Sequence, residues 1–190
     1  MTVKKVWAVY FSGTGTTKKT VDRIAHRLAE ALGTDCEVYD YTLPAARRQE
    51  LTIPSGDVAV VGCPTYAGRV PNLLMPYLRD MVHGEGALAV PVVLFGNRNY
   101  DDALMELSQL LTADGFSCVA GGAFVGEHSF SRTLGAGRGD VKRKVAITLK
   151  NQGEIKNKRL SHYAESRPGK TGRLFCVVGL ERRKIFLVEN

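Results

Sequence analysis

Long hydrophobic runs are missing from this sequence of 190 residues. No stretch of about 18 consecutive apolar residues occurs, so a conventional transmembrane helix is not expected. The first residues pass directly into a strand-like pattern and lack the layout of a signal peptide. We therefore expect a cytoplasmic protein with no membrane partner.

Cysteine is also scarce. The four cysteines, Cys36, Cys63, Cys118 and Cys176, lie far apart and form no Cys-x-x-Cys pair. This pattern provides neither a disulfide framework nor the ligands of a zinc or iron–sulfur site. The four histidines fall on separate predicted elements, without the spacing of a metal site or a catalytic triad. We expect reduced structural thiols, no metal and no catalytic side chain.

Basic residues are unevenly distributed along the chain, whose net charge is +7. Residues 1–140 contain 13 Lys and Arg against 15 Asp and Glu, a net charge of −2, whereas residues 141–190 contain 13 against 4, a net charge of +9. The excess therefore belongs to a C-terminal segment and does not indicate a basic face on the main domain. Because this segment lacks interleaved aromatic residues that could stack on bases, we expect no nucleic-acid partner.

Hydrophobic periodicity predicts alternating strands and helices. Residues 3–11 are apolar on both faces, as in a central parallel strand, and residues 16–32 show helical spacing that ends at Gly33. Further strands are predicted at 36–41, 58–63, 90–96 and 118–125, and further helices at 72–82 and 100–114. This alternation predicts an α/β domain with a doubly wound, five-stranded parallel sheet.

The predicted domain comprises residues 1–152 and ends in a short closing helix at 141–151. Residues 153–190 form a basic tail, in which a polar segment precedes an apolar run at 174–180. One interpretation is a flexible linker that ends in a β-hairpin, with its turn at 179–183, which docks on the domain or on a partner. The other is that the tail results from truncation or a reading-frame change in a longer fusion gene.

The loop after the first strand has the sequence SGTGTT, residues 12–17. Its glycines free backbone amides, its hydroxyls can donate hydrogen bonds, and the following helix directs its positive end toward it. These features favour a phosphate-binding loop, although it matches neither the ATP-binding nor the dinucleotide-binding motif. The alternative is a polar turn that only caps the helix.

Two further loops follow the third and fourth predicted strands, where doubly wound sheets bind their ligands. PTYAGRVP, residues 64–71, places Tyr66 in an irregular backbone, and GNRNYDDAL, residues 96–104, places Tyr100 at the start of a helix. Either tyrosine could stack on a planar ligand. Alternatively, Tyr66 covers the sheet edge, Asn99 is a helix N-cap and Tyr100 packs locally. A phosphate loop combined with two aromatic loops matches the shape of FMN.

In these three loops the sequence resembles the flavodoxin family, over roughly residues 3–137. The sequences of these loops, together with residues 123–138, are most similar to those of flavodoxin-like domains that precede a ferredoxin module in some anaerobic bacteria. The resemblance implies that residues 12–17 hold the FMN phosphate, that Tyr66 and Tyr100 flank the flavin ring, and that backbone groups near Thr65, Gly68 and Gly96 contact its polar edge. The predicted cofactor-binding residues are Ser12, Gly13, Thr14, Gly15, Thr16, Thr17, Pro64, Thr65, Tyr66, Ala67, Gly68, Gly96, Asn97, Arg98, Asn99 and Tyr100.

The resemblance implies an FMN-binding electron-transfer protein whose partners are redox proteins such as ferredoxin or a reductase. Two features depart from the pattern. Flavodoxins are typically acidic, which this chain is not, and the fusion relatives continue into cysteine clusters, whereas residues 139–190 contain only Cys176. The alternatives are an FMN-dependent NAD(P)H:quinone or small-molecule reductase, and a flavin-free binding module on the same fold.

Overall fold

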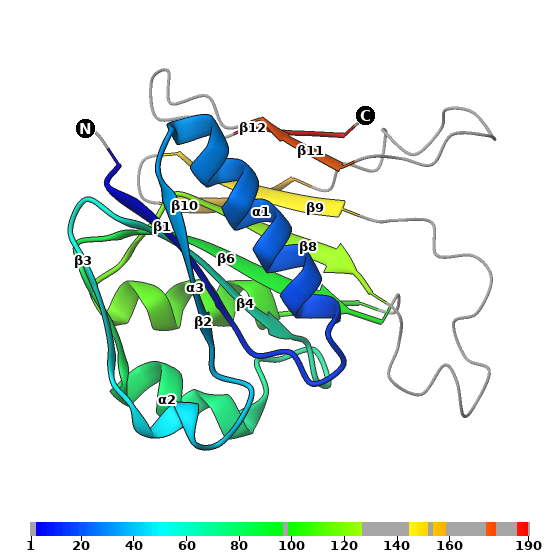
Figure 1. Ribbon diagram of the computed structural model, residues 1–190. Helices are drawn as coiled ribbons and strands as arrows, with labels where there is room; N and C mark the ends of the chain where they lie inside the picture. The colour runs from blue at the N-terminus through cyan, green and yellow to red at the C-terminus, as the bar shows by residue number, and fades with distance from the viewer. Residues whose placement is uncertain are drawn as a thin grey trace.

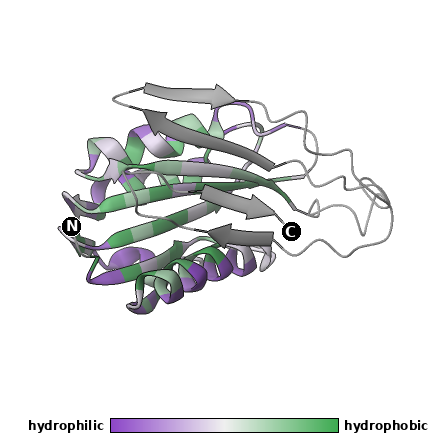
Figure 2. Cartoon of the chain, turned by 90° about the horizontal axis from the view of Figure 1, so that it is seen from above, coloured by the Kyte–Doolittle hydropathy of each residue, from purple (hydrophilic) through white to green (hydrophobic). Residues whose placement is uncertain are grey.

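The computed structural model describes residues 3–96 and 99–126, together with the backbone of four later strands. In the described part, a central β-sheet is covered by α1 (Thr16–Leu32) on one face and by α2 (Met75–Asp80) and α3 (Ala103–Ala113) on the other (Figure 1). Each face has its own hydrophobic core. Figure 2 shows the central strands mostly in the green of hydrophobic residues.

The predicted parallel sheet is present. Its strands lie in the order β2-β1-β4-β6-β8, and every neighbouring pair in this set is parallel. The strands are β1 (Lys5–Tyr10), β2 (Asp35–Asp40), β4 (Val58–Pro64), β6 (Leu88–Phe95) and β8 (Ala120–Val125). The chain turns back across β1 to reach β4, so the strand order reverses between these two strands. This is the position at which doubly wound sheets bind ligands.

The sequence explains why these elements form. β4 reads VAVVGCP, and its first six residues are buried because helices cover both faces. Along α1 the buried residues Val21, Ile24, Ala25 and Leu28 face the sheet. Gly33 ends this helix with a positive φ of 64°, and its N–H points back to the carbonyls of the last turn.

Two predicted helices differ in their boundaries. The segment predicted as helix at 72–82 contains a 3₁₀ turn (Asn72–Leu74) and the short α2, and Val82 begins strand β5 (Val82–Glu85). β5 pairs in parallel with β3 (Leu51–Pro54), whose alternating burial follows the period of a strand. α3 begins three residues after Tyr100, because Asp101 has a φ of 42° that a right-handed helix cannot contain.

The predicted closing helix at 141–151 is wrong. The structure has strand β9 (Val145–Asn151), which pairs antiparallel with β8, and β10 (Glu154–Lys158), which pairs antiparallel with β9. The physical reason is the β-branched content of VAITLKN, which favours strand, together with the open hydrogen-bonding edge of β8. The sheet continues past residue 152, because β10 belongs to it. The predicted boundary between domain and tail at residue 152 stays a prediction.

Two more strands of the tail are described. β11 (Leu174–Val177) and β12 (Phe186–Glu189) pair antiparallel, as the predicted hairpin requires, and also form a sheet of their own. The β11 backbone lies beside α1 (Figure 1). The predicted turn at 179–183 lies outside the described residues, as does most of the polar segment before β11. The short strand β7 (Ser117–Cys118) pairs in parallel with the start of β6.

Gly62 allows α1 to approach β4. A Cβ atom at this position would lie 2.2 Å from Val21 Cγ2 and 3.2 Å from Thr17 Cγ2. We expect Gly62→Ala to destabilise the protein by about 1 to 3 kcal/mol, because the helix or its side chains must shift. Urea unfolding measures this. The control is Gly121→Ala, whose new methyl group would make ordinary contacts at 3.4 Å and should cost less.

Candidate functional site

The three predicted loops meet at one edge of the sheet. They follow β1, β4 and β6, whose carboxyl ends lie side by side in the parallel sheet. A Cβ atom on Gly13 of the first loop would lie 3.9 Å from the hydroxyl oxygen of Tyr66 in the second loop. The fold therefore brings the predicted phosphate loop and the predicted ring loop next to each other.

The first loop ends in a left-handed glycine. Gly15 is the N-cap of α1, with φ 81° and ψ −7°, and no side chain caps the helix at this position. The hydroxyl oxygen of Ser12 accepts a hydrogen bond of 2.9 Å from the amide of Lys18, in the first turn of α1. Ser12 therefore caps the helix, as the alternative interpretation of this loop expects. Its hydroxyl can still donate its proton to another acceptor.

Several amides of this loop remain open. Within residues 3–96 and 99–126, the backbone N–H groups of Gly13, Thr14, Thr16 and Thr17 donate to no protein acceptor. They lie at the N-terminus of a 17-residue helix, where the helix dipole favours an anion. The Thr14 and Thr16 hydroxyls lie 3.4 Å apart. This arrangement can bind an anion with backbone and hydroxyl donors alone.

Lys18 is engaged elsewhere. Its ammonium group hydrogen-bonds to the Tyr10 hydroxyl, lies 3.2 Å from Asp22 Oδ2, and is 4.9 Å from the Tyr10 ring centroid. The hydrogen bond to Tyr10, followed by that to Asp22, raises the pKa of Lys18. Lys18 is therefore held on the flank of α1 by Tyr10 and Asp22.

The second loop contains a tight turn. Tyr66 and Arg69 exchange two backbone hydrogen bonds of 3.0 Å, and the two residues between them, Ala67 and Gly68, have φ values of 50° and 80°. Two consecutive left-handed residues are typical of a type I′ turn. The turn presents Tyr66 with 47% of its surface exposed.

Thr65 carries the clearest sign of a missing polar partner in this loop. Its backbone N–H donates to the Leu94 carbonyl at 2.7 Å, which fixes the start of the loop on β6. Its hydroxyl oxygen is buried, yet it has no hydrogen-bond partner among the described residues. A buried hydroxyl without a partner is costly, and a polar ligand atom would satisfy it.

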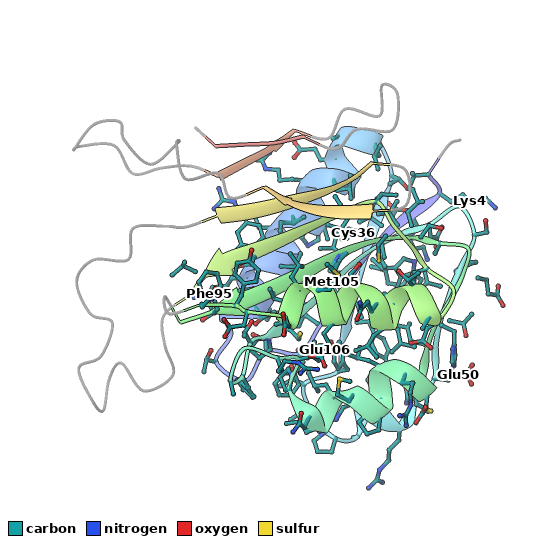
Figure 3. All side chains as sticks on the ribbon, turned by 180° about the vertical axis from the view of Figure 1, so that it is seen from behind. Lys4, Cys36, Glu50, Phe95, Met105 and Glu106 are labelled. Carbon is teal, nitrogen blue, oxygen red and sulfur yellow. The ribbon has the colours of Figure 1, made fainter. Side chains whose placement is uncertain are left out.

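Glu106 of α3, labelled in Figure 3, holds the second loop in place. Its carboxylate accepts hydrogen bonds from the Val70 amide at 2.8 Å and from Arg69 Nε and Nη2 at 3.1 and 2.5 Å. The amide of Asp102 donates to the Gly68 carbonyl at 3.1 Å. The hydrogen bond from Arg69 is the main cause that lowers the pKa of Glu106. Glu106 was not among the predicted residues, because no local pattern links it to the turn.

The third loop is described in part, since Asn97 and Arg98 lie outside the described residues. Asn99 bonds locally, with its Nδ2 2.6 Å from Asp101 Oδ1, and the N-cap of α3 is Asp102 rather than Asn99. Tyr100 is half-buried, and its ring centroid lies 5.4 Å from that of Phe95. Tyr100 is thus less available than Tyr66, and its contact with a planar ligand stays a prediction.

Residues outside the predicted loops complete the site. The hydroxyl oxygen of Thr42, after β2, accepts a hydrogen bond of 2.9 Å from the Ser12 amide, and Arg47 binds the Thr42 carbonyl. After β8, a Cβ atom on Gly126 would lie 2.9 Å from Thr16 Cγ2. Thr42 and Arg47 were not among the predicted residues, because they follow a strand at which no ligand loop was expected.

The described residues contain no cluster of three or more His, Cys, Asp or Glu that could hold a metal ion. Burial raises the pKa of Cys63, at the end of β4, to about 12, so its thiol is neutral and unreactive at neutral pH. No helix in the described part of the chain is long and apolar enough to cross a membrane. This edge of the sheet combines open backbone amides at a helix N-terminus with an exposed aromatic ring.

A solved structure supports this architecture. No protein-family model and no curated protein matches the chain. A solved flavodoxin from the domain Archaea has 14% sequence identity and a TM-score of 0.51, and the match covers 65% of this chain and 84% of that chain. A flavodoxin from Streptococcus pneumoniae TIGR4 has 23% identity and a TM-score of 0.47, with coverages of 65% and 83%.

The archaeal match shows that the chain has a flavodoxin-like fold, as the sequence predicts. The strand order β2-β1-β4-β6-β8 is the order of that fold. The narrower resemblance to domains that precede a ferredoxin module stays a prediction.

The lowered pKa of Glu106 leads to a pH-dependent stability. A carboxyl group whose pKa is depressed by folding stabilises the protein above its ordinary pKa of 4.5, and this contribution is lost as the pH falls through the folded value. We expect Glu106→Gln to lower the free energy of unfolding by about 1 kcal/mol at neutral pH, since Arg69 is exposed. The difference between the two proteins should shrink below pH 4.5.

Urea unfolding at neutral and acidic pH measures this effect. Asp80→Asn is the control, because among the described residues the exposed Asp80 pairs only with its exposed neighbour Arg79. An equal difference between Glu106→Gln and the parent protein at both pH values would show that the charge of Glu106 contributes nothing.

Proposed function

We propose that this protein binds FMN noncovalently and serves as an electron-transfer protein. The observation that carries the proposal is the set of four open amides at the N-terminus of α1, beside the exposed ring of Tyr66. A ligand that joins a phosphate to a planar aromatic ring fits this pair of features, and FMN has that composition.

The first loop fits the phosphate group. The amides of Gly13, Thr14, Thr16 and Thr17 and the hydroxyls of the loop supply donors, and α1 supplies the positive end of its dipole. The described residues of the loop contribute no carboxylate that would repel a dianion. The site therefore binds phosphate through neutral donors, and Lys18 does not take part.

The second loop fits the ring system. Tyr66 offers an exposed aromatic face, and the unpartnered hydroxyl of Thr65 offers a polar contact at the base of the loop. The amides of Ala67 and Gly68 also donate to no acceptor within the described residues, so they can contact a polar ring edge. Glu106 keeps these groups in a fixed arrangement before the ligand arrives.

When bound, the flavin supplies the electron-transfer chemistry, so the chain needs no general acid, base or nucleophile of its own. The residues of the site hold the phosphate, orient the ring against Tyr66 and limit the access of water. The partners we propose are redox proteins such as a ferredoxin or a reductase, because an exposed Tyr66 would leave the bound ring close to the surface.

A negative charge in the first loop tests the phosphate site. We expect Thr14→Asp to weaken FMN binding by more than about tenfold, because the new carboxylate repels the phosphate dianion, while riboflavin binding changes little. Fluorescence titration with both ligands measures this. Thr52→Asp adds the same charge on the exposed side of β3 and is the control. Equal losses for FMN and riboflavin would place the phosphate elsewhere.

Removal of the ring of Tyr66 tests the flavin contact. We expect Tyr66→Ala to weaken FMN binding about fivefold, since an aromatic contact contributes about 1 kcal/mol beyond its buried area. The same change should move the reduction potential toward that of free FMN, because water reaches the ring. Tyr66→Phe keeps the ring and should keep both properties.

Tyr100→Ala is expected to act in the same direction as Tyr66→Ala if Tyr100 lies on the other side of the flavin. A redox titration of both variants beside the parent protein makes the comparison. Unchanged affinity and unchanged potential in a variant would remove that tyrosine from the site.

A further inference from the structure

The segment after β2 is fastened to the phosphate loop by one hydrogen bond. The Ser12 amide donates to the Thr42 hydroxyl oxygen over 2.9 Å, although the two residues are 30 positions apart in the chain. Ser12 is also held through its own hydroxyl, which accepts from the Lys18 amide at 2.9 Å. Its main chain and its side chain are therefore both fixed, on two different elements.

Arg47 anchors Thr42 in turn. Its Nη1 atom donates to the carbonyl of Tyr41 at 3.0 Å and to that of Thr42 at 2.8 Å. The guanidinium carbon lies 5.8 Å from the centroid of the Phe11 ring, directly before the phosphate loop. Tyr41 is fully buried and donates its hydroxyl to the Gly62 carbonyl at 3.3 Å, so this anchor rests on the core.

These contacts decide which amides of the loop stay open. The hydrogen bond to Thr42 fixes the orientation of the Ser12 peptide, from which the loop continues. Among the amides of residues 13–17, that of Gly15 bonds to the Ser12 carbonyl, and the others stay open within the described residues. A loop with two glycines has many accessible conformations, and ordering it on binding costs affinity. A loop that is fixed in advance avoids that cost.

Arg47 also brings a positive charge. Within the described part of the chain it forms no salt bridge, whereas Lys18 and Arg69 are each paired with a carboxylate. Arg47 is half-buried, so its charge is less screened by solvent than that of the exposed Arg48 beside it. An anion at the loop would experience this charge even without touching the side chain.

We propose that Thr42 and Arg47 are positioning residues that preorganise the phosphate loop and so make the protein select FMN over riboflavin. This inference rests on the proposed function. The role is that of positioning, because Thr42 acts through Ser12 and Arg47 acts through Thr42. The charge of Arg47 adds attraction for the anion from a distance. Neither residue belongs to the three loops that the sequence pattern indicates as ligand loops.

Thr42→Val tests the hydrogen bond to Ser12. Valine keeps the shape of threonine but provides no acceptor, so the Ser12 amide loses its partner. We expect FMN affinity to fall about tenfold and riboflavin affinity to change less than about twofold. Thr42→Ser restores the hydroxyl and should recover most of the FMN affinity. Urea unfolding of each cofactor-free variant shows whether it is folded.

Arg47→Met tests the anchor and the charge, with Arg48→Met as the matched control. We expect Arg47→Met to weaken FMN binding about tenfold at low salt, and the ratio to the parent protein to decrease at high salt as screening removes the charge effect. Arg48→Met should bind FMN like the parent. This pair keeps the proposal testable even if Thr42→Val does not fold.

The outcomes separate the two proposals. If the parent protein binds neither FMN nor riboflavin, the proposed function fails. If the parent binds FMN but folded Thr42→Val and Arg47→Met bind it equally well, or lose FMN and riboflavin in equal measure, the proposed function stands and the positioning role is overturned. Selective loss of FMN binding in both variants supports the role.

Discussion

The close approach of α1 to β4 at Gly62 is the constraint on which the candidate site depends. Since Gly62 has no side chain, Val21 and Thr17 can pack directly against β4. This contact sets the N-terminus of α1 over the point where the strand order reverses, between β1 and β4. The open amides of the first loop therefore lie next to the turn that carries Tyr66.

Contacts between distant segments stabilise the loops around this point. Thr42 and Arg47 fasten the first loop to the end of β2, and Glu106 fastens the second loop to α3. Thr42 and Glu106 each accept a hydrogen bond from a backbone amide of a glycine-containing loop. Ligand binding is tighter when the backbone of such a loop is fixed in advance. We propose that these contacts shape the site before a ligand enters. The Thr65 hydroxyl and the open amides have no protein partner among the described residues, so they can bind a polar ligand atom.

The sequence predicted the features that depend on local pattern. The buried strands β1, β4 and β6 read as continuous apolar runs, and α1 was bounded by its helical period and by Gly33. The pairing of β3 with β5 was missed because each strand has only four residues, too few to distinguish from a loop. Strand β9 was mistaken for a helix because its partner, the edge of β8, cannot be read from the segment itself.

The candidate site, too, was predicted only where it depends on local sequence pattern. The three loops were located, because glycines, hydroxyls and aromatic residues follow strands that a doubly wound sheet places together. Thr42, Arg47 and Glu106 were not found, since their roles arise from hydrogen bonds to backbone groups that are 5 to 36 positions away. Such contacts leave no spacing pattern in the chain.

The absorption spectrum of the purified protein, followed by titration of the cofactor-free chain with FMN, tests whether this protein binds FMN. We expect flavin absorption bands, or a saturable quenching of FMN fluorescence at one FMN per chain, with weaker binding of riboflavin. A colourless, folded protein that leaves FMN fluorescence unchanged would contradict the proposed function.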